Sequence, residues 1–200
     1  MKIYFDGCSH TWGSELDNNI QSRYSNLVCN HFGAEEYNIA ERGGSDHRLT
    51  RNLLEHDLSQ YDMFVIQMTY KRRNEYFYDG GWKKTNWNII FDKVDFKLHN
   101  GHNITYKHPP SEVKEVWYGY YTKLHSDVLA DSNQLIYYNV IKGLIEHKPH
   151  AIIGIDNSDK LPLDFSYQKN NLPRRGGGHP SEKGHKIIAN DVISLLTKHK

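Results

Sequence analysis

Two short apolar runs constrain the fold of this 200-residue chain more than any other feature. Residues 63–66 and 151–155 carry no charged or amide side chain, which is the pattern of strands covered on both faces. Elsewhere apolar residues recur at helical spacing, and strands that alternate with helices pair in parallel. The sequence therefore predicts one domain over residues 1–200, a three-layer α/β/α sandwich around a parallel sheet.

The other elements follow from spacing and from residues that start or stop helices. Further strands are expected at 2–5 and 36–39. One helix is expected over 22–32, where Gly33 can end it, and another begins after Ser45 or Asp46 as its cap. Later helices are expected after Ser111, over 135–145 and over 182–196. The apolar faces expected for the second, third and fourth of these helices are Leu49, Leu53, Leu54 and Leu58; Val113, Val116, Trp117, Tyr120, Tyr121 and Leu124; and Leu135, Ile136, Val140, Ile141, Leu144 and Ile145.

Residues 70–110 form an excursion in which aromatic, Asn, Gly and charged residues show no clear periodicity. A stretch of this length is unusual in a compact domain and points to function. Three interpretations stay open. The segment is a lid or a wall that contacts a sugar, with Tyr70 and Arg72 binding substrate; it is a surface loop; or it stacks single-stranded bases.

The overall charge argues against nucleic acid as the default partner. The 25 Lys+Arg and 24 Asp+Glu leave a formal net charge of +1, too small for the field on which duplex binding relies. No secretory segment or membrane span is recognisable, and Cys8 and Cys29 form no disulfide framework. We expect a cytoplasmic protein without a membrane partner, and its oligomeric state stays open.

Polar residues follow each predicted strand, where reactive groups gather in open parallel sheets. Ser9 lies in a glycine-flanked turn after the first strand, and His179 arrives from a distant loop. A hydroxyl on the first turn of a helix with a histidine base is the arrangement of a nucleophile and its general base. Gly43, after the second strand, would bring a backbone N–H close to a reacting carbonyl.

Three sequence blocks resemble those of the SGNH (GDSL) hydrolases. Residues 7–13, Gly-Cys-Ser-His-Thr-Trp-Gly, are similar to the family's first block, with Cys8 in place of Asp. Residues 38–45 and 179–185 resemble the second and last blocks, and the three blocks stand in the family's order. A Gly-Cys-Ser start of this kind is also associated with phage-encoded chains, which would act in a host.

The resemblance implies a flavodoxin-like SGNH hydrolase fold and the hydrolysis of esters, including O-acetyl groups on carbohydrates, without a metal or organic cofactor. It makes Ser9 the nucleophile, His179 the base, and the amides of Ser9 and Gly43 donors to the oxyanion. Ser9 as a helix cap, His179 as a surface histidine and Gly43 as a turn residue are the structural alternatives.

The chain departs from the family pattern at two positions. The third block lacks its Asn, so Thr69 or Asn74 would have to supply the further oxyanion donor. Gly176 stands where the family has an Asp that orients the histidine. We expect either a Ser-His dyad, an orienting backbone carbonyl, or a carboxylate from elsewhere, with Asp156 as the first candidate.

Other readings of the reactive residues are weaker. His185 is expected to pack behind the site, Cys8 to point into the core, and Arg174 to hold an anionic substrate group or lie in solvent. His99, His102 and His108 have ligand spacing but lack the Glu of His-Glu-x-x-His, which argues against a metal. The main alternative to an esterase is an SGNH-fold protein with weakened catalysis that recognises a glycan or a protein partner.

Overall fold

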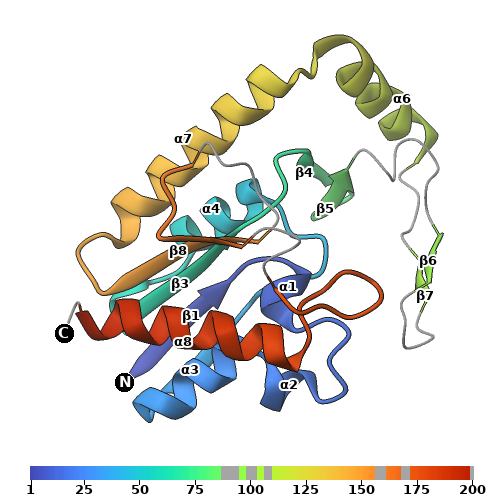
Figure 1. The fold of residues 1–200 in the computed structure, drawn as a ribbon. Helices are drawn as coiled ribbons and strands as arrows, with labels where there is room; N and C mark the ends of the chain where they lie inside the picture. Colours follow the sequence, from blue (N-terminus) through green and yellow to red (C-terminus); the bar gives the residue numbers. More distant parts are fainter. Residues whose placement is uncertain (87–94, 98–102, 106–109, 156–160, 168–171, 199–200) are drawn as a thin grey trace.

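The computed structural model describes residues 1–86, 95–97, 103–105, 110–155, 161–167 and 172–198. At its centre lies a five-stranded sheet with the order β2-β1-β3-β8-β9, and every pairing in it is parallel (Figure 1). This order is the flavodoxin-like one, so the predicted α/β/α architecture is confirmed. The strands are β1 (Lys2–Asp6), β2 (Glu35–Asn38), β3 (Met63–Met68), β8 (His150–Ile155) and β9 (Phe165–Tyr167).

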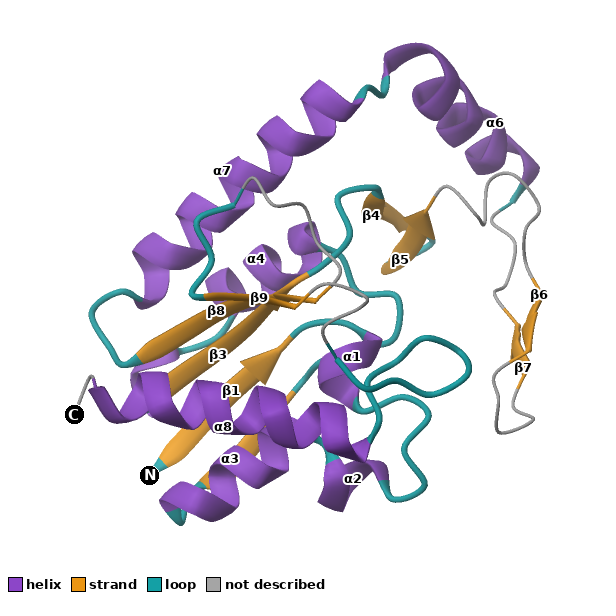
Figure 2. Ribbon diagram, in the orientation of Figure 1, coloured by secondary structure: helices purple, strands orange, loops and turns teal. Residues whose placement is uncertain are grey.

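Helices cover both faces of the sheet (Figure 2). Along β1, Ile3 and Phe5 pack into the cluster under α3 and α8, whereas Tyr4 packs into the cluster under α4 and α7. Burying each such side chain contributes about 1.5–3 kcal/mol, so the two clusters hold the layers together. None of the helices within the described residues is long and apolar enough to cross a membrane. The covering helices are α3 (Tyr24–Phe32), α8 (Glu182–Lys198), α4 (Asp46–Glu55) and α7 (Asp127–Ile145).

Several helix boundaries differ from the predictions. The expected helix 22–32 is split, because Arg23 is extended (φ −71°, ψ 147°) between α2 (Asn19–Ser22) and α3. Ser45 caps α4 by accepting a hydrogen bond from the Arg48 amide, as one of the two alternatives predicted. Ser111 is the first residue of α6 (Ser111–Gly119) rather than its cap, which is Pro110.

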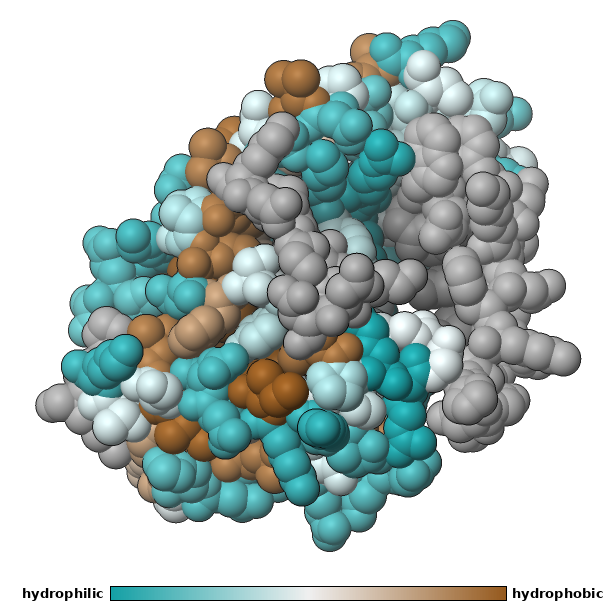
Figure 3. Space-filling view, viewed as in Figure 1, coloured by the Kyte–Doolittle hydropathy of each residue, from teal (hydrophilic) through white to brown (hydrophobic). Residues whose placement is uncertain are grey.

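The outer face of α7 carries apolar side chains that were expected inside. Leu135 and Ile136 are 44% and 57% exposed, as Leu54 on α4 is at 63%. Figure 3 shows hydrophobic surface patches at the upper left, where α7 runs in the same view of Figure 1. Ile141 and Ile145 are buried as predicted, in a stripe spaced by three or four residues that also contains Ala130, Gln134 and Tyr138.

The excursion contains regular structure that its sequence did not predict. β4 (Arg73–Tyr78) and β5 (Gly81–Asn86) form an antiparallel hairpin, and β6 (Asp95–Lys97) pairs with β7 (Asn103–Thr105). Asp79 and Gly80 both have positive φ, 48° and 69°, as a tight two-residue hairpin turn requires. α6 follows and continues into the single turn η2 (Tyr120–Leu124), while β6 and β7 lie away from the central sheet in Figure 1.

Candidate active site

The turn that carries Ser9 is packed tightly against the neighbouring strand. Ser9 is the first residue of α1 (Ser9–Trp12), directly after β1. Gln67 of β3 holds this turn, because its side-chain oxygen accepts from the Cys8 amide at 3.0 Å and the Thr11 hydroxyl at 3.2 Å. A Cβ on Gly7 would fall 2.3 Å from the Thr11 hydroxyl oxygen. Glycine at position 7 therefore allows the turn to close, and Ser9 lies at the carboxyl end of the sheet.

Ser9, His179 and Glu15 form a continuous hydrogen-bonded line. The Ser9 Oγ lies 2.9 Å from Nε2 of His179, and Nδ1 of His179 lies 2.9 Å from Oε2 of Glu15. The His179 amide donates to the same carboxylate oxygen at 3.2 Å. A carboxylate accepts only from Nδ1–H, so it selects the imidazole tautomer whose Nε2 accepts from the Ser9 hydroxyl. The line has the geometry of a nucleophile, a base and an orienting acid.

Glu15 reaches this position through an unusual loop. It follows α1, whose C-cap is Gly13 with φ 87°, and Glu15 itself has φ 68°. A left-handed conformation costs a residue with a Cβ about 1–2 kcal/mol, and such strain concentrates at functional sites. A Cβ on Gly177 would fall 1.9 Å from Oε1 of Glu15. The glycine run before His179 therefore leaves room for a carboxylate from the opposite end of the chain.

The environment keeps His179 neutral. Burial lowers the pKa of His179 below the ordinary value of 6.5, and the positive charges of Arg73 and Arg42 lower it further. The hydrogen bond and the charge of Glu15 act in the opposite direction and raise this pKa. A neutral imidazole near pH 7 can accept a proton from Ser9, as a general base must.

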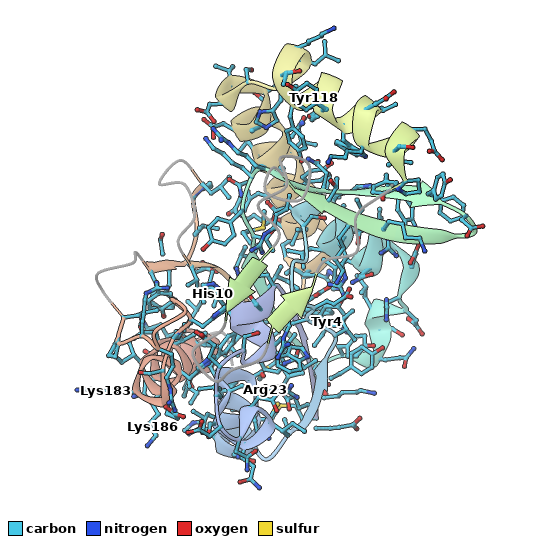
Figure 4. The ribbon with its side chains drawn as sticks, turned by 90° about the vertical axis from the view of Figure 1, so that its right-hand side faces the viewer. Tyr4, His10, Arg23, Tyr118, Lys183 and Lys186 are labelled. Carbon is cyan, nitrogen blue, oxygen red and sulfur yellow. The ribbon has the colours of Figure 1, made fainter. Side chains whose placement is uncertain are left out.

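A second imidazole packs against the first. The ring of His10 lies 5.1 Å from that of His179, and the Tyr70 ring lies 6.4 Å from His10 on another side. Burial is the main cause that lowers the pKa of His10, so it adds no cation beside His179. Figure 4 shows His10 inside the molecule, whereas Lys183 and Lys186 of α8 point outward.

The loop after β2 brings a further backbone amide to the nucleophile turn. Asn38 donates to the Thr11 carbonyl at 3.2 Å, and the Glu41 amide donates to the Gly7 carbonyl at 3.3 Å. These contacts hold the loop against this turn, where a Cβ on Gly44 would fall 2.8 Å from the Gly7 carbonyl oxygen. The preceding residue, Gly43, is buried and has φ 75°. Within the described part of the chain, no acceptor is bonded to the amide of Ser9 or of Gly43. Neither amide is therefore occupied by an acceptor in this part of the chain.

Comparisons with known proteins agree with this geometry at the level of the fold. The chain aligns over 100% of its length with 65% of a carbohydrate esterase whose active site displays divergent catalytic and non-catalytic binding functions, at 13% identity and a TM-score of 0.58. It has the fold of the SGNH (GDSL) hydrolases. A family-two carbohydrate esterase from Cellvibrio japonicus (10% identity, TM-score 0.52, 98% and 60% covered) and a lipolytic G-D-S-L protein from Veillonella parvula (12% identity, TM-score 0.50, 99% and 99% covered) are also similar.

The sequence itself is distant from known families. No protein-family model and no curated protein matches it. The chain spans 65% and 60% of the lengths of the two carbohydrate esterases. The sequence motifs were thus sufficient to predict the SGNH fold, and the resemblance is confirmed in three dimensions.

The residues expected to complete an SGNH oxyanion hole have other partners. The Thr69 hydroxyl and amide donate to Oδ1 of Asp46, at 3.0 and 2.6 Å. Asn74 donates its amide to the hydroxyl of Tyr121 at 3.1 Å. Neither side chain has a contact with Ser9 among the interactions described. Asp156, the predicted orienting carboxylate, lies outside the described residues, and Glu15 is the residue found at Nδ1 of His179.

The three predicted substrate-binding residues lie in different settings. Tyr70 lies next to the site through its contact with His10. Arg72 is paired with Asp127 at 3.0 Å on the surface, and Arg174 donates to the Gly178 carbonyl in the loop before His179. Tyr70 therefore contacts a residue that packs against His179, and the charge of Arg174 lowers the pKa of that same residue, His10.

The remaining reactive residues lie behind the site. Nδ1 of His185 accepts from the Tyr24 amide at 3.1 Å, and burial lowers the pKa of His185 to about 4. The Cys8 thiol is buried and donates to Gln67. No group of metal-ligating side chains occurs among the described residues, and His99, His102 and His108 fall outside them.

Sequence reasoning missed Glu15, because no motif links a glutamate after a first helix to a histidine 164 residues later. The one indirect signal was the glycine run of residues 176–178, which stands where the SGNH pattern has its own acid. Glycine leaves space that another side chain can fill.

Proposed function

We propose that this protein is a serine ester hydrolase that acts through a covalent acyl-enzyme. The observation that carries the proposal is the line from Ser9 through His179 to Glu15, with both hydrogen bonds at 2.9 Å. Ser9 is the first residue of α1 and not its cap, which is Cys8, so helix capping does not explain its contact with His179. This arrangement is the one that acyl transfer needs.

In the first half of the reaction, the Ser9 oxygen attacks the ester carbonyl while Nε2 of His179 takes the hydroxyl proton. The Glu15 carboxylate stabilises the resulting imidazolium, since it already holds Nδ1. The amides of Ser9 and Gly43 hold the negative oxygen, and losing one such donor typically costs about 10²–10³-fold in rate. The imidazolium then gives its proton to the departing alcohol, and an acyl-Ser9 remains.

The second half returns the enzyme to its starting state. Water attacks the acyl carbonyl while His179 takes one of its protons, and the same amides hold the new oxyanion. The imidazolium returns the proton to the Ser9 oxygen as the carboxylic acid leaves. O-acyl groups on a carbohydrate are the substrate class we favour, because carbohydrate esterases are among the proteins of similar fold.

One observation favours a second candidate, a binding protein that has lost most of its catalysis. The Thr69 hydroxyl is bonded to Asp46, and Asn74 is bonded to Tyr121. The site would then work with two oxyanion donors rather than three. Such a protein would recognise a glycan or a protein partner without hydrolysing an ester, so an activity assay separates the two candidates.

The test is hydrolysis of p-nitrophenyl acetate by the wild-type protein and by Ser9→Ala and His179→Ala. Ser59→Ala and His147→Ala are matched controls, because both residues are exposed and lie on other elements. We expect each site variant to lose at least about 10³-fold in kcat while the controls keep the wild-type rate. Equal rates in Ser9→Ala and the wild type would overturn the proposal.

A further inference from the structure

Arg42 and Arg73 stand near the candidate site without a carboxylate at ion-pair distance among the described residues. Both side chains are half-buried, and the charge of Arg73 lowers the pKa of the buried Asp46 without an ion pair between them. A guanidinium with free N–H donors can bind an anionic ligand. The arginines that do pair with described carboxylates are Arg23, Arg48, Arg51, Arg72 and Arg175.

Arg42 is held over the helix that begins with Ser9. Its guanidinium carbon lies 4.0 Å from the centre of the Trp12 ring, at the last residue of α1. It directly precedes Gly43 and Gly44 in the loop after β2. Its Nε is buried and has no hydrogen-bond partner among the described residues. The backbone carbonyl of Arg42 accepts from Lys84 at 2.9 Å, so the β4–β5 hairpin helps to fix this loop.

Arg73 approaches the same place from the start of β4. Its guanidinium carbon lies 4.5 Å from the centre of the Tyr70 ring, and its Nη1 donates to the Gly44 carbonyl at 3.4 Å. Tyr70 contacts His10, which packs on His179. Both arginines lower the pKa of His179, so their charges act on one imidazole.

Stacking fixes the two guanidinium groups but leaves their edges able to donate. An aromatic face orients the plane of the group, and the N–H donors at its edge then match a carboxylate or similar oxyanion. Arg42 precedes Gly43 in the loop after β2, and Arg73 donates to the carbonyl of the next residue, Gly44. Both cations therefore lie at the loop whose Gly43 amide is a proposed oxyanion donor.

We propose that Arg42 and Arg73 form an anion-binding subsite, so that the substrate is an ester that carries a carboxylate close to the scissile bond. An O-acylated acidic sugar is the class of molecule that fits. This inference rests on the proposed function. It also revises the expectation that Arg72 and Arg174 supply the cations for the substrate.

The test compares two matched pairs of esters. The first pair, 4-acetoxybenzoate and 4-acetoxybenzamide, places the charge on the alcohol side. The second pair, mono-p-nitrophenyl succinate and p-nitrophenyl butyrate, places it on the acyl side. Each kcat/KM is divided by the rate of hydroxide-catalysed hydrolysis of the same ester, so that the ratio within a pair reports recognition.

We expect the wild type to prefer the anionic member of at least one pair by about 10- to 100-fold, mainly through a lower KM. Arg42→Gln and Arg73→Gln reduce that ratio to near one, and Arg42→Lys and Arg73→Lys keep part of it. Arg51→Gln is the control, because Arg51 also stacks on a ring, that of Trp82, yet is paired with Glu75. Its ratio should equal that of the wild type.

A measurement on the wild type does not depend on how the variants fold. Raising NaCl from about 0.05 to about 0.5 M should weaken the preference for the anionic ester, because salt screens the attraction. Ratios near one in both pairs, with Ser9-dependent hydrolysis of the neutral esters, would overturn the subsite and leave the esterase standing. No Ser9-dependent hydrolysis of any of the four esters would overturn both.

Discussion

Glu15 is the residue whose charge the proposed mechanism requires at Nδ1 of His179. Changing Glu15→Gln keeps an oxygen that can accept from Nδ1 but removes the negative charge. The structure gives this carboxylate two donors on the same residue, the ring Nδ1 at 2.9 Å and the amide at 3.2 Å. The substitution therefore tests the charge with little change in shape.

The size of the effect follows from the charge that His179 acquires in the transition state. At about 4 Å and an effective dielectric constant of about 20, two unit charges attract by about 4 kcal/mol. Since about 1.4 kcal/mol corresponds to a factor of ten in rate, kcat should fall about 10³-fold. KM should change little, because the charge pair forms only during the reaction.

The assay is kcat and kcat/KM for p-nitrophenyl acetate across pH. His179 must be neutral to act, and burial lowers its pKa below 6.5. Wild-type activity should therefore persist at pH 6.5 and fall only at lower pH, where His179 becomes protonated. Because Glu15 raises the pKa of His179, Glu15→Gln should move this acid limb to lower pH. Glu55→Gln, an exposed i,i+4 partner of Arg51, is the control.

A loss of less than about tenfold in a folded Glu15→Gln protein would refute this reasoning. It would mean that a Ser-His dyad is sufficient, as one of the sequence-based alternatives held. An acid limb that moved to higher pH would also contradict the assignment, because Glu15 would then not be stabilising the imidazolium.

Three further predictions concern packing and stability. Gly177→Ala should lower kcat by about 10²-fold, since its Cβ would displace Glu15. Gly143→Ala, with open space around it on α7, should keep activity and raise the unfolding free energy by about 0.5–1 kcal/mol. The pKa of His185 is about 4 in the folded protein and about 6.5 in the unfolded chain. As the pH falls from 6.5 to 4, the unfolded chain binds a proton that the folded protein does not, so the unfolding free energy should fall by about 3 kcal/mol. The pKa of Asp46 is raised to about 6, so Asp46 changes the stability with pH in the opposite direction. The measurement is therefore the difference in unfolding free energy between His185→Gln and the wild type, taken by chemical denaturation at pH 7 and at pH 4, because Asp46 is the same in both proteins. An equal difference at the two pH values would contradict this role of His185.

The central sheet could be predicted because its signals are local. Continuous apolar runs mark β3 and β8, and both strands are buried on two faces. β9 gave no such signal, because it has three residues, one of which is the exposed Ser166. It pairs with the last three residues of β8, Ile153–Ile155. The prediction that Leu135 and Ile136 are buried was wrong, because apolar residues lie on more than one face of this helix and the sequence does not show which face packs against the sheet.

The site divides in the same way. Ser9 and His179 stand in short motifs, so their neighbourhoods could be read from the chain. Glu15 could not, because its role depends on a left-handed backbone and on a void beside Gly177, and both exist only in the folded chain. Arg42 and Arg73 were missed because their approach to one site, over the rings of Trp12 and Tyr70, exists only in the folded chain.

The most direct test of the central claim is covalent labelling with a fluorophosphonate, followed by mass spectrometry of the digested protein. We expect one adduct, on the peptide that contains Ser9, forming more slowly in Glu15→Gln and absent in Ser9→Ala. No adduct on the folded wild-type protein, or an adduct on another serine that survives Ser9→Ala, would contradict the account.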